Sequence, residues 1–236
     1  MKSSSFLQLL AVMMALSSCG KNTLFRQVPS SESGIDFVNR IVETDSVNPL
    51  TTVNIYKGGG VGVGDFNNDG LQDLYFTGNQ VPNRLYINNG DLKFRDITEE
   101  AGVSGQGRWS RGVSVVDINH DGWQDIYISV TLAEKPEHRQ NLLYVNQGKQ
   151  VDVKIKFLEK AREYGLNDSS HSTMANFFDY DLDGDLDMYL VVNEIGKREN
   201  PNKFRPIVSD GSAPSTGRLY QNNWDPVRKH PVFTDV

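Results

Sequence analysis

The strongest constraint in this sequence is a threefold internal repeat. One pattern, D-x-[DN]-x-D-G-x-x-D followed by an apolar residue, a tyrosine and a second apolar residue, recurs without gaps at residues 65–76, 117–128 and 179–190. A second matched set, Leu-Tyr-x-Asn, follows at residues 85–88, 143–146 and 219–222. Tandem repeats of this kind are supersecondary units that bury their apolar faces against one another. We therefore expect a stack of similar units.

Phenylalanines mark the unit boundaries. Phe94 and Phe157 are each followed eight residues later by a glycine, and Phe233 opens a similar segment. The expected domains are repeat 1 at 25–93, repeat 2 at 94–156, repeat 3 at 157–232, and the start of a fourth repeat at 233–236. Propellers close a ring of about four to eight blades. Three repeats therefore predict an incomplete propeller, which would be the N-terminal part of a longer chain.

Each unit is predicted to be β-structure. Residues 61–66 and 113–118 are rich in β-branched side chains, and the repeated tyrosine segments are short apolar runs bounded by Asn and Gly. About four strands per unit, in tandem, fit propeller blades better than a sandwich. The expected fold is therefore all-β, with tandem four-stranded blades. The glycines at 58–64 are expected to allow close packing between strands.

The aspartate loops are suited to a hard cation. Alternate positions of a tight loop direct oxygens inward, and glycine at position 6 permits the sharp turn. Oxygen ligands in flexible geometry favour Ca²⁺ over zinc, copper or Mg²⁺. An EF-hand is excluded because its position 12 needs Glu, whereas Phe76, Ile128 and Leu190 stand there. A β-roll of nonapeptides has the wrong period. A metal-free hairpin, with carboxylates serving only the turn, stays the alternative.

The loop with its flanking strands resembles FG-GAP/VCBS repeats, the blades of integrin-alpha-like β-propellers. Residues 58–70 are especially similar to secreted bacterial lipoproteins with VCBS repeats. The resemblance implies about three Ca²⁺ sites, one in each repeat. Because the number of charged ligands tunes affinity, the third loop, with four carboxylates at its ligand positions, should bind most tightly. The side-chain ligands it implies are Asp65, Asn67, Asp69 and Asp73, then Asp117, Asn119, Asp121 and Asp125, then Asp179, Asp181, Asp183 and Asp187. Backbone carbonyl ligands would come from Leu71, Trp123 and Asp185.

The N-terminus has the features of an export signal. Residues 1–18 combine Lys2 with an apolar stretch that is too short to span a bilayer. Small residues then lead into Cys19, which resembles the lipobox of bacterial lipoproteins. The resemblance implies a lipidated Cys19, a lipid-anchored tether at 19–33, and export to a bacterial membrane, with the outer membrane as the expected location. An ordinary signal peptide is the alternative.

Composition narrows the function. A net charge of −6 argues against a nucleic-acid partner, and the single cysteine excludes an intramolecular disulfide or a Cys-based metal centre. The sequence contains none of the common catalytic motifs, and its histidines are scattered. The spacer between the two repeated motifs lengthens in successive units, and such insertions often form a binding face. We expect a non-enzymatic, calcium-stabilised module that binds a protein or a glycan. The alternative is a polysaccharide hydrolase or lyase, or the scaffold of one whose active site lies in missing sequence.

Overall fold

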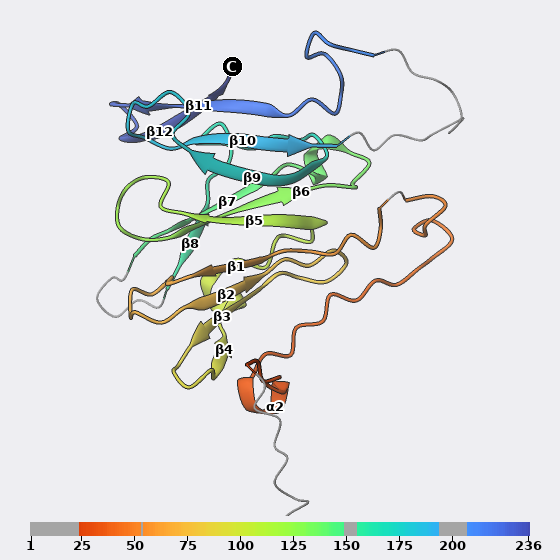
Figure 1. The fold of residues 1–236 in the computed structure, drawn as a ribbon, viewed down its shortest axis with the longest axis vertical. Helices are drawn as coiled ribbons and strands as arrows, with labels where there is room; N and C mark the ends of the chain where they lie inside the picture. Colours follow the sequence, from red (N-terminus) through yellow and green to blue (C-terminus); the bar gives the residue numbers. More distant parts are fainter. Residues whose placement is uncertain (1–23, 53, 149–154, 194–206) are drawn as a thin grey trace, which may run out of the picture.

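The computed structural model describes residues 24–52, 54–148, 155–193 and 207–236. Their strands form three four-stranded antiparallel sheets, stacked along the long axis of the molecule (Figure 1). The first sheet contains β1 (Val61–Gly64), β2 (Asp73–Phe76), β3 (Arg84–Asn88) and β4 (Phe94–Asp96). The second contains β5 (Ser110–Val116), β6 (Asp125–Val130), β7 (Leu142–Asn146) and β8 (Phe157–Glu159). The third contains β9 (Ser172–Phe178), β10 (Asp187–Val192), β11 (Arg218–Asp225) and β12 (His230–Asp235). Short helices are α2 (Ser30–Ser33), α3 (Thr98–Ala101) and the 3-10 turn η1 (Pro136–His138).

Each sheet is a meander in which neighbouring strands follow one another in sequence. This confirms the all-β prediction of four strands per unit, and the stack is consistent with propeller-like blades. The described residues form three such sheets and do not close into a ring.

The sheets are offset from the predicted repeats. Phe94, Phe157 and Phe233 each pair with the asparagine of the preceding Leu-Tyr-x-Asn strand, at Asn88, Asn146 and Asn222. These pairings assign β4, β8 and β12 to the same sheets as the strands that precede them. The boundary at 94 falls between β3 and β4, and the boundary at 157 falls between β7 and β8. Residues 233–235, predicted to start a fourth repeat, lie in β12 and complete the third sheet.

Two apolar cores hold the sheets together, one at each interface. The first includes Tyr75 and Leu85 from the first sheet with Ile126 and Ile128 from the second. The second core includes Tyr127 of β6 together with residues of the third sheet. Successive β6 side chains thus point into different cores, and all six β6 residues are buried. Burial on both faces explains why most β6 side chains are apolar instead of alternating with polar ones.

The predicted close packing at the glycines 58–64 is present where β1 approaches β5. A Cβ added at Gly62 would lie 2.9 Å from a Val115 methyl group, and one at Gly60 would lie 3.0 Å from the carbonyl oxygen of Arg111. Any side chain there would push the first two sheets apart.

The segment between Ser33 and Val42 packs beside the first sheet. Tyr86 donates a hydrogen bond to Asp36 (2.8 Å), Asn39 donates to Asn79 (2.8 Å), and the rings of Phe37 and Phe76 stack with centroids 5.2 Å apart. The signal peptide predicted at 1–18, Cys19 and the first residues of the tether lie outside the described residues. In the described part of the chain, no helix has both the length and the apolar character needed to cross a membrane.

Candidate metal centre

The three aspartate loops occupy the same place in each sheet. They connect β1 to β2, β5 to β6 and β9 to β10, which are the first two strands of each sheet. The predicted glycine turns are present, since Gly70, Gly122 and Gly184 have φ angles of 86°, 84° and 98°. Such angles are readily adopted by glycine and rarely by other residues. The glycine at position 6 is therefore required by the backbone.

The position 1 carboxylate organises each loop. Asp65 accepts hydrogen bonds from the backbone N–H groups of Asp69 (3.1 Å) and Gly70 (2.8 Å). Asp117 and Asp179 accept the equivalent pairs, at 3.1 and 2.9 Å in the second loop and at 3.2 and 3.2 Å in the third. These bonds hold the turn while the remaining lone pairs of the carboxylate stay available to a ligand.

The loops differ at position 3. Asn67 and Asn119 donate amide hydrogen bonds to the position 5 carboxylates, at 2.8 and 2.9 Å. In the third loop the equivalent residue is Asp181, which cannot donate; it accepts instead from Gln221 of β11 at 2.9 Å. In the third loop, positions 3 and 5 are therefore both carboxylates, and no position 3 amide donates to the position 5 carboxylate.

The third loop also gathers carboxylates most closely. Asp179, Asp181 and Asp187 each offer an oxygen, and the three oxygens lie within 4.8 Å of one another. Among the described residues this is the one cluster of three His, Cys, Asp or Glu side chains that meets this spacing. An oxygen-only donor set of this size fits Ca²⁺ better than zinc or copper.

The position 9 aspartates are buried and connect the loop to a strand of the same sheet through hydrogen bonds, a role that we call a staple. Asp125 is fully buried, and its two oxygens accept from the backbone N–H groups of Ile118 (3.0 Å) and Asn146 (2.7 Å). Asp73 and Asp187 make the same pairs of bonds in their own sheets. Each aspartate thus ties its loop to the third strand of the sheet. This role is independent of any metal.

Burial shifts the pKa of these carboxyls. Desolvation raises the pKa of Asp73 to about 6 and that of Asp125 to about 7, against backbone hydrogen bonds that lower it, and the other loop carboxylates raise it further. In the third loop, burial and the neighbouring carboxylates Asp183, Asp187 and Asp181 raise the pKa of Asp185 to about 6. A bound cation would oppose these shifts because it favours the ionised forms.

The structure adds one residue per site that the sequence analysis matched but left without a role. In each Leu-Tyr-x-Asn strand, the backbone N–H of the asparagine donates a hydrogen bond to the position 9 carboxylate. The side-chain amide of the same asparagine donates a second hydrogen bond to a backbone carbonyl of the loop. Asn88, Asn146 and Asn222 donate to the carbonyl oxygens of Gln72 (3.0 Å), Gln124 (3.2 Å) and Leu186 (3.1 Å). The signal was their constant place in all three repeats.

At position 7, the predicted carbonyl donors Leu71, Trp123 and Asp185 lie within the loops as expected from their spacing. Their N–H groups donate to the position 5 carboxylates at 2.8, 2.9 and 3.1 Å. The first two loops also touch, since Asn68 donates to the carbonyl oxygen of Gly122 at 3.0 Å. The fold therefore gathers three of the predicted side-chain ligands, Asp179, Asp181 and Asp187, in the third loop. Among the described residues, neither Asp183 nor the carboxylates of the first two loops belong to such a cluster.

The sequence is similar to a known repeat family and to one group of animal proteins. Residues 65–128 match the model of the FG-GAP-like repeat. This span contains the first two aspartate loops. The chain is also similar to cartilage acidic protein 1. It is 26% identical to the protein from Xenopus tropicalis over 196 residues, which is 77% of this chain and 29% of the relative. It is 32% identical to the protein from Homo sapiens over 113 residues, which is 48% of this chain and 17% of the relative. The chain thus spans less than a third of the length of these relatives.

Proposed function

We propose that the three loops bind Ca²⁺ and that the ion stabilises a propeller-like binding module. The observation that carries this proposal is the oxygen cluster of Asp179, Asp181 and Asp187. Three carboxylates at this spacing repel one another, and a divalent cation converts that repulsion into attraction. The match to an FG-GAP-like repeat over the first two loops supports the same conclusion.

Calorimetry with Ca²⁺ tests the metal proposal. Because a ligand that binds only the folded state raises its stability, Ca²⁺ is expected to raise the melting temperature relative to chelator. Asp183→Asn is expected to remove more of this gain than Asp69→Asn, the same change at position 5 of the first loop. Asp183→Ala should likewise cost more than Asn67→Ala. Absence of Ca²⁺ uptake, or identical melting in chelator and in Ca²⁺, would contradict the proposal.

We also propose that the mature protein is an exported lipoprotein anchored through Cys19. The support is the position of the chain's single cysteine directly after the signal-like residues 1–18. Cells expressing the protein should incorporate labelled palmitate into it, and it should partition with membranes. Cys19→Ala should abolish both while leaving calcium binding intact. A soluble, unlabelled wild-type protein would refute the anchor.

The proposed activity is recognition rather than catalysis. The ligand would be a protein or a glycan, bound through the connections at the end of the sheets opposite the aspartate loops, where the spacers between repeated motifs lengthen. A polysaccharide screen distinguishes the two classes. Retention of an unchanged polysaccharide supports binding, whereas release of soluble fragments would favour an enzyme.

A further inference from the structure

A polar pocket of about 780 Å³ lies between the second and third sheets. Its walls come from the β6–β7 connection, the β8–β9 connection, Asn193 after β10, and the start of β11. Meander topology places these segments at the end of the sheets away from the aspartate loops. The volume lies within the range of about 300–1,000 Å³ that is typical of small-molecule sites.

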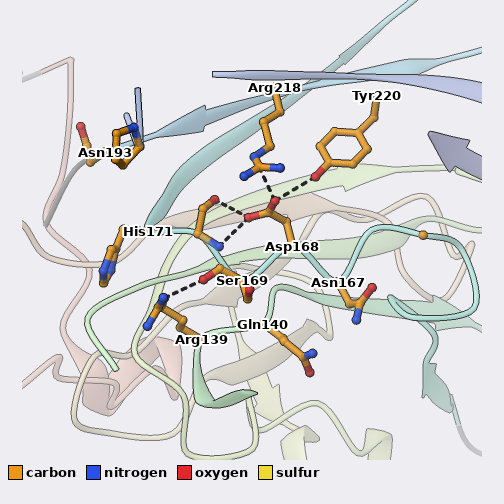
Figure 2. Close-up of a pocket in the computed structure, with 12 residues that line it drawn as sticks. Arg139, Gln140, Asn167, Asp168, Ser169, His171, Asn193, Arg218 and Tyr220 are labelled. Atoms are coloured by element: carbon orange, nitrogen blue, oxygen red, sulfur yellow. Dashed lines mark hydrogen bonds and ion pairs between the residues drawn. The ribbon is translucent and has the colours of Figure 1, made fainter. Parts of the chain in front are cut away.

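Asp168 is the one acidic residue among the described residues that line the pocket, and its carboxylate already has hydrogen-bond and ion-pair partners (Figure 2). The side chain of Asp168 is 5% exposed, and Arg218 lies 3.3 Å from its Oδ2. Tyr220 donates to Oδ2 at 2.9 Å, and the backbone N–H of Ser170 donates to Oδ1 at 2.7 Å. Asp168 therefore acts as a wall of the pocket rather than as a free anion, and Arg218 is fixed beside it.

A second arginine of the pocket, Arg139, is held in place by hydrogen bonds to the backbone. Arg139 donates through Nε to the carbonyl oxygen of Ser169 (2.6 Å) and through Nη1 to those of Ala133 and Glu134 (both 2.9 Å). Within the described part of the chain, the Nη2 group of Arg139 makes no hydrogen bond, and no carboxylate forms an ion pair with this arginine. Three backbone acceptors thus fix the guanidinium, and no carboxylate among the described residues neutralises its charge. A guanidinium fixed in this way is preorganised for an anion.

The remaining polar groups suit hydroxyl groups. The Nδ1 atom of His171 accepts from the N–H of Leu132 at 3.3 Å, so Nε2 carries the proton of the neutral ring. Asn167 and Gln140 line the pocket with side-chain amides, which both donate and accept. In Figure 2, Arg139 and His171 lie to the left of Asp168, with Arg218 and Tyr220 above it.

We propose that this pocket binds a carboxylate-bearing sugar, such as a uronic acid unit of an acidic glycan. The carboxylate would pair with Arg139, since arginine binds carboxylates through parallel N–H donors. The ring hydroxyls would bond to the amide and histidine groups. An acidic peptide fits less well because its affinity needs apolar anchors or a free strand edge, and the pocket wall is chiefly polar. This inference rests on the proposed role in glycan recognition.

Calorimetry of the calcium-loaded full chain with trigalacturonate tests the assignment. The methyl ester of the same trisaccharide has nearly the same shape without the charge, and it is expected to bind about tenfold more weakly or worse. Asn167→Asp adds a negative charge to the pocket, and the side chain of Asn167 has no hydrogen bond within the described residues. It should weaken trigalacturonate binding by about tenfold. Asn89→Asp makes the same change at an exposed turn of the first sheet and should leave binding unaltered.

Arg139→Met provides the second variant, and it should abolish binding of the acid while leaving Ca²⁺ uptake unchanged. Equal binding of acid and ester, or equal effects of the two asparagine variants, would overturn the proposal. Triglutamate binding as tightly as trigalacturonate would overturn the sugar assignment in favour of an acidic peptide. Because Ca²⁺ uptake is measured on the same samples, failure of the sugar pocket and failure of the metal proposal give different results.

Discussion

At the scale of single residues, position 9 of the aspartate loops has a structural role beside the metal-ligand role proposed for it, and the sequence did not reveal the structural role. The spacing singled out the candidate ligands, whose metal binding stays a prediction, because alternation within a tight loop is a local property. The stapling role of position 9 depends on a strand far along the chain, since Asp125 meets the N–H of Asn146. Nothing in the loop itself specifies that partner. The repeated asparagine was detectable, but its hydrogen bond was not.

The staple predicts a metal-independent loss of stability. Asp125→Asn replaces one carboxylate oxygen by an amide that cannot accept, so either the Ile118 or the Asn146 N–H is left without its buried partner. In chelator, we expect the free energy of unfolding to fall by about 1–3 kcal/mol. Asp121→Asn, at an exposed loop position, should cost less under the same conditions. Equal losses in denaturant titrations would show that Asp125 does not act as a staple.

His171 predicts a pH dependence. Burial, and then the charge of Arg139, lower the pKa of its ring below 6.5. The unfolded chain therefore binds this proton more readily than the folded protein, and stability falls as the pH drops below about 6.5. His171→Asn retains an acceptor for the N–H of Leu132 but does not titrate. Between about pH 7.5 and pH 5.5, the melting temperature should fall further for the wild type than for the variant. Parallel pH profiles would contradict this assignment.

At the scale of elements, the strands were predictable but their grouping was not. Apolar-Tyr-apolar and Leu-Tyr-x-Asn runs identify strands because side-chain alternation is local. A tandem repeat, however, can be divided at any point without changing its period. Hydrogen-bond pairing decides where a sheet begins, and the pairings of Phe94 and Phe157 assign those strands to the preceding sheets.

Close approach between the first strands of adjacent sheets gives a further prediction. A Cβ at Gly112 of β5 would lie 2.4 Å from the carbonyl oxygen of Thr173 and 2.9 Å from the Cα of Met174 in β9. Since backbone atoms cannot yield easily, Gly112→Ala should destabilise the fold by about 1–3 kcal/mol. Gly62→Ala, which meets valine methyl groups, should cost less. Unfolding in urea measures both, and the reverse order would be inconsistent with rigid packing of β5 on β9.

At the scale of the whole molecule, equivalent tyrosines report which sheet faces are covered. Tyr75 and Tyr127 are fully buried, and their hydroxyl groups donate to the carbonyl oxygens of Val103 (2.6 Å) and Leu166 (3.1 Å) ahead of the next sheet. Tyr189 occupies the same position in the third sheet. It is 41% exposed, and its hydroxyl has no hydrogen bond among the described residues. This tyrosine position is therefore part of the core in the first two sheets and half-open to solvent in the third.

The exposed face of the third sheet predicts self-association. A sheet face built to pack against a neighbour retains apolar surface, which favours contact with another molecule. We expect the apparent mass of the purified, calcium-loaded chain to rise with concentration in size-exclusion chromatography with light scattering. Tyr189→Lys should reduce this association by placing a charge on the face. Tyr56→Lys, at another exposed tyrosine, serves as the control and should not. A monomer at every concentration, or equal effects of the two substitutions, would show that this face of the third sheet does not mediate self-association.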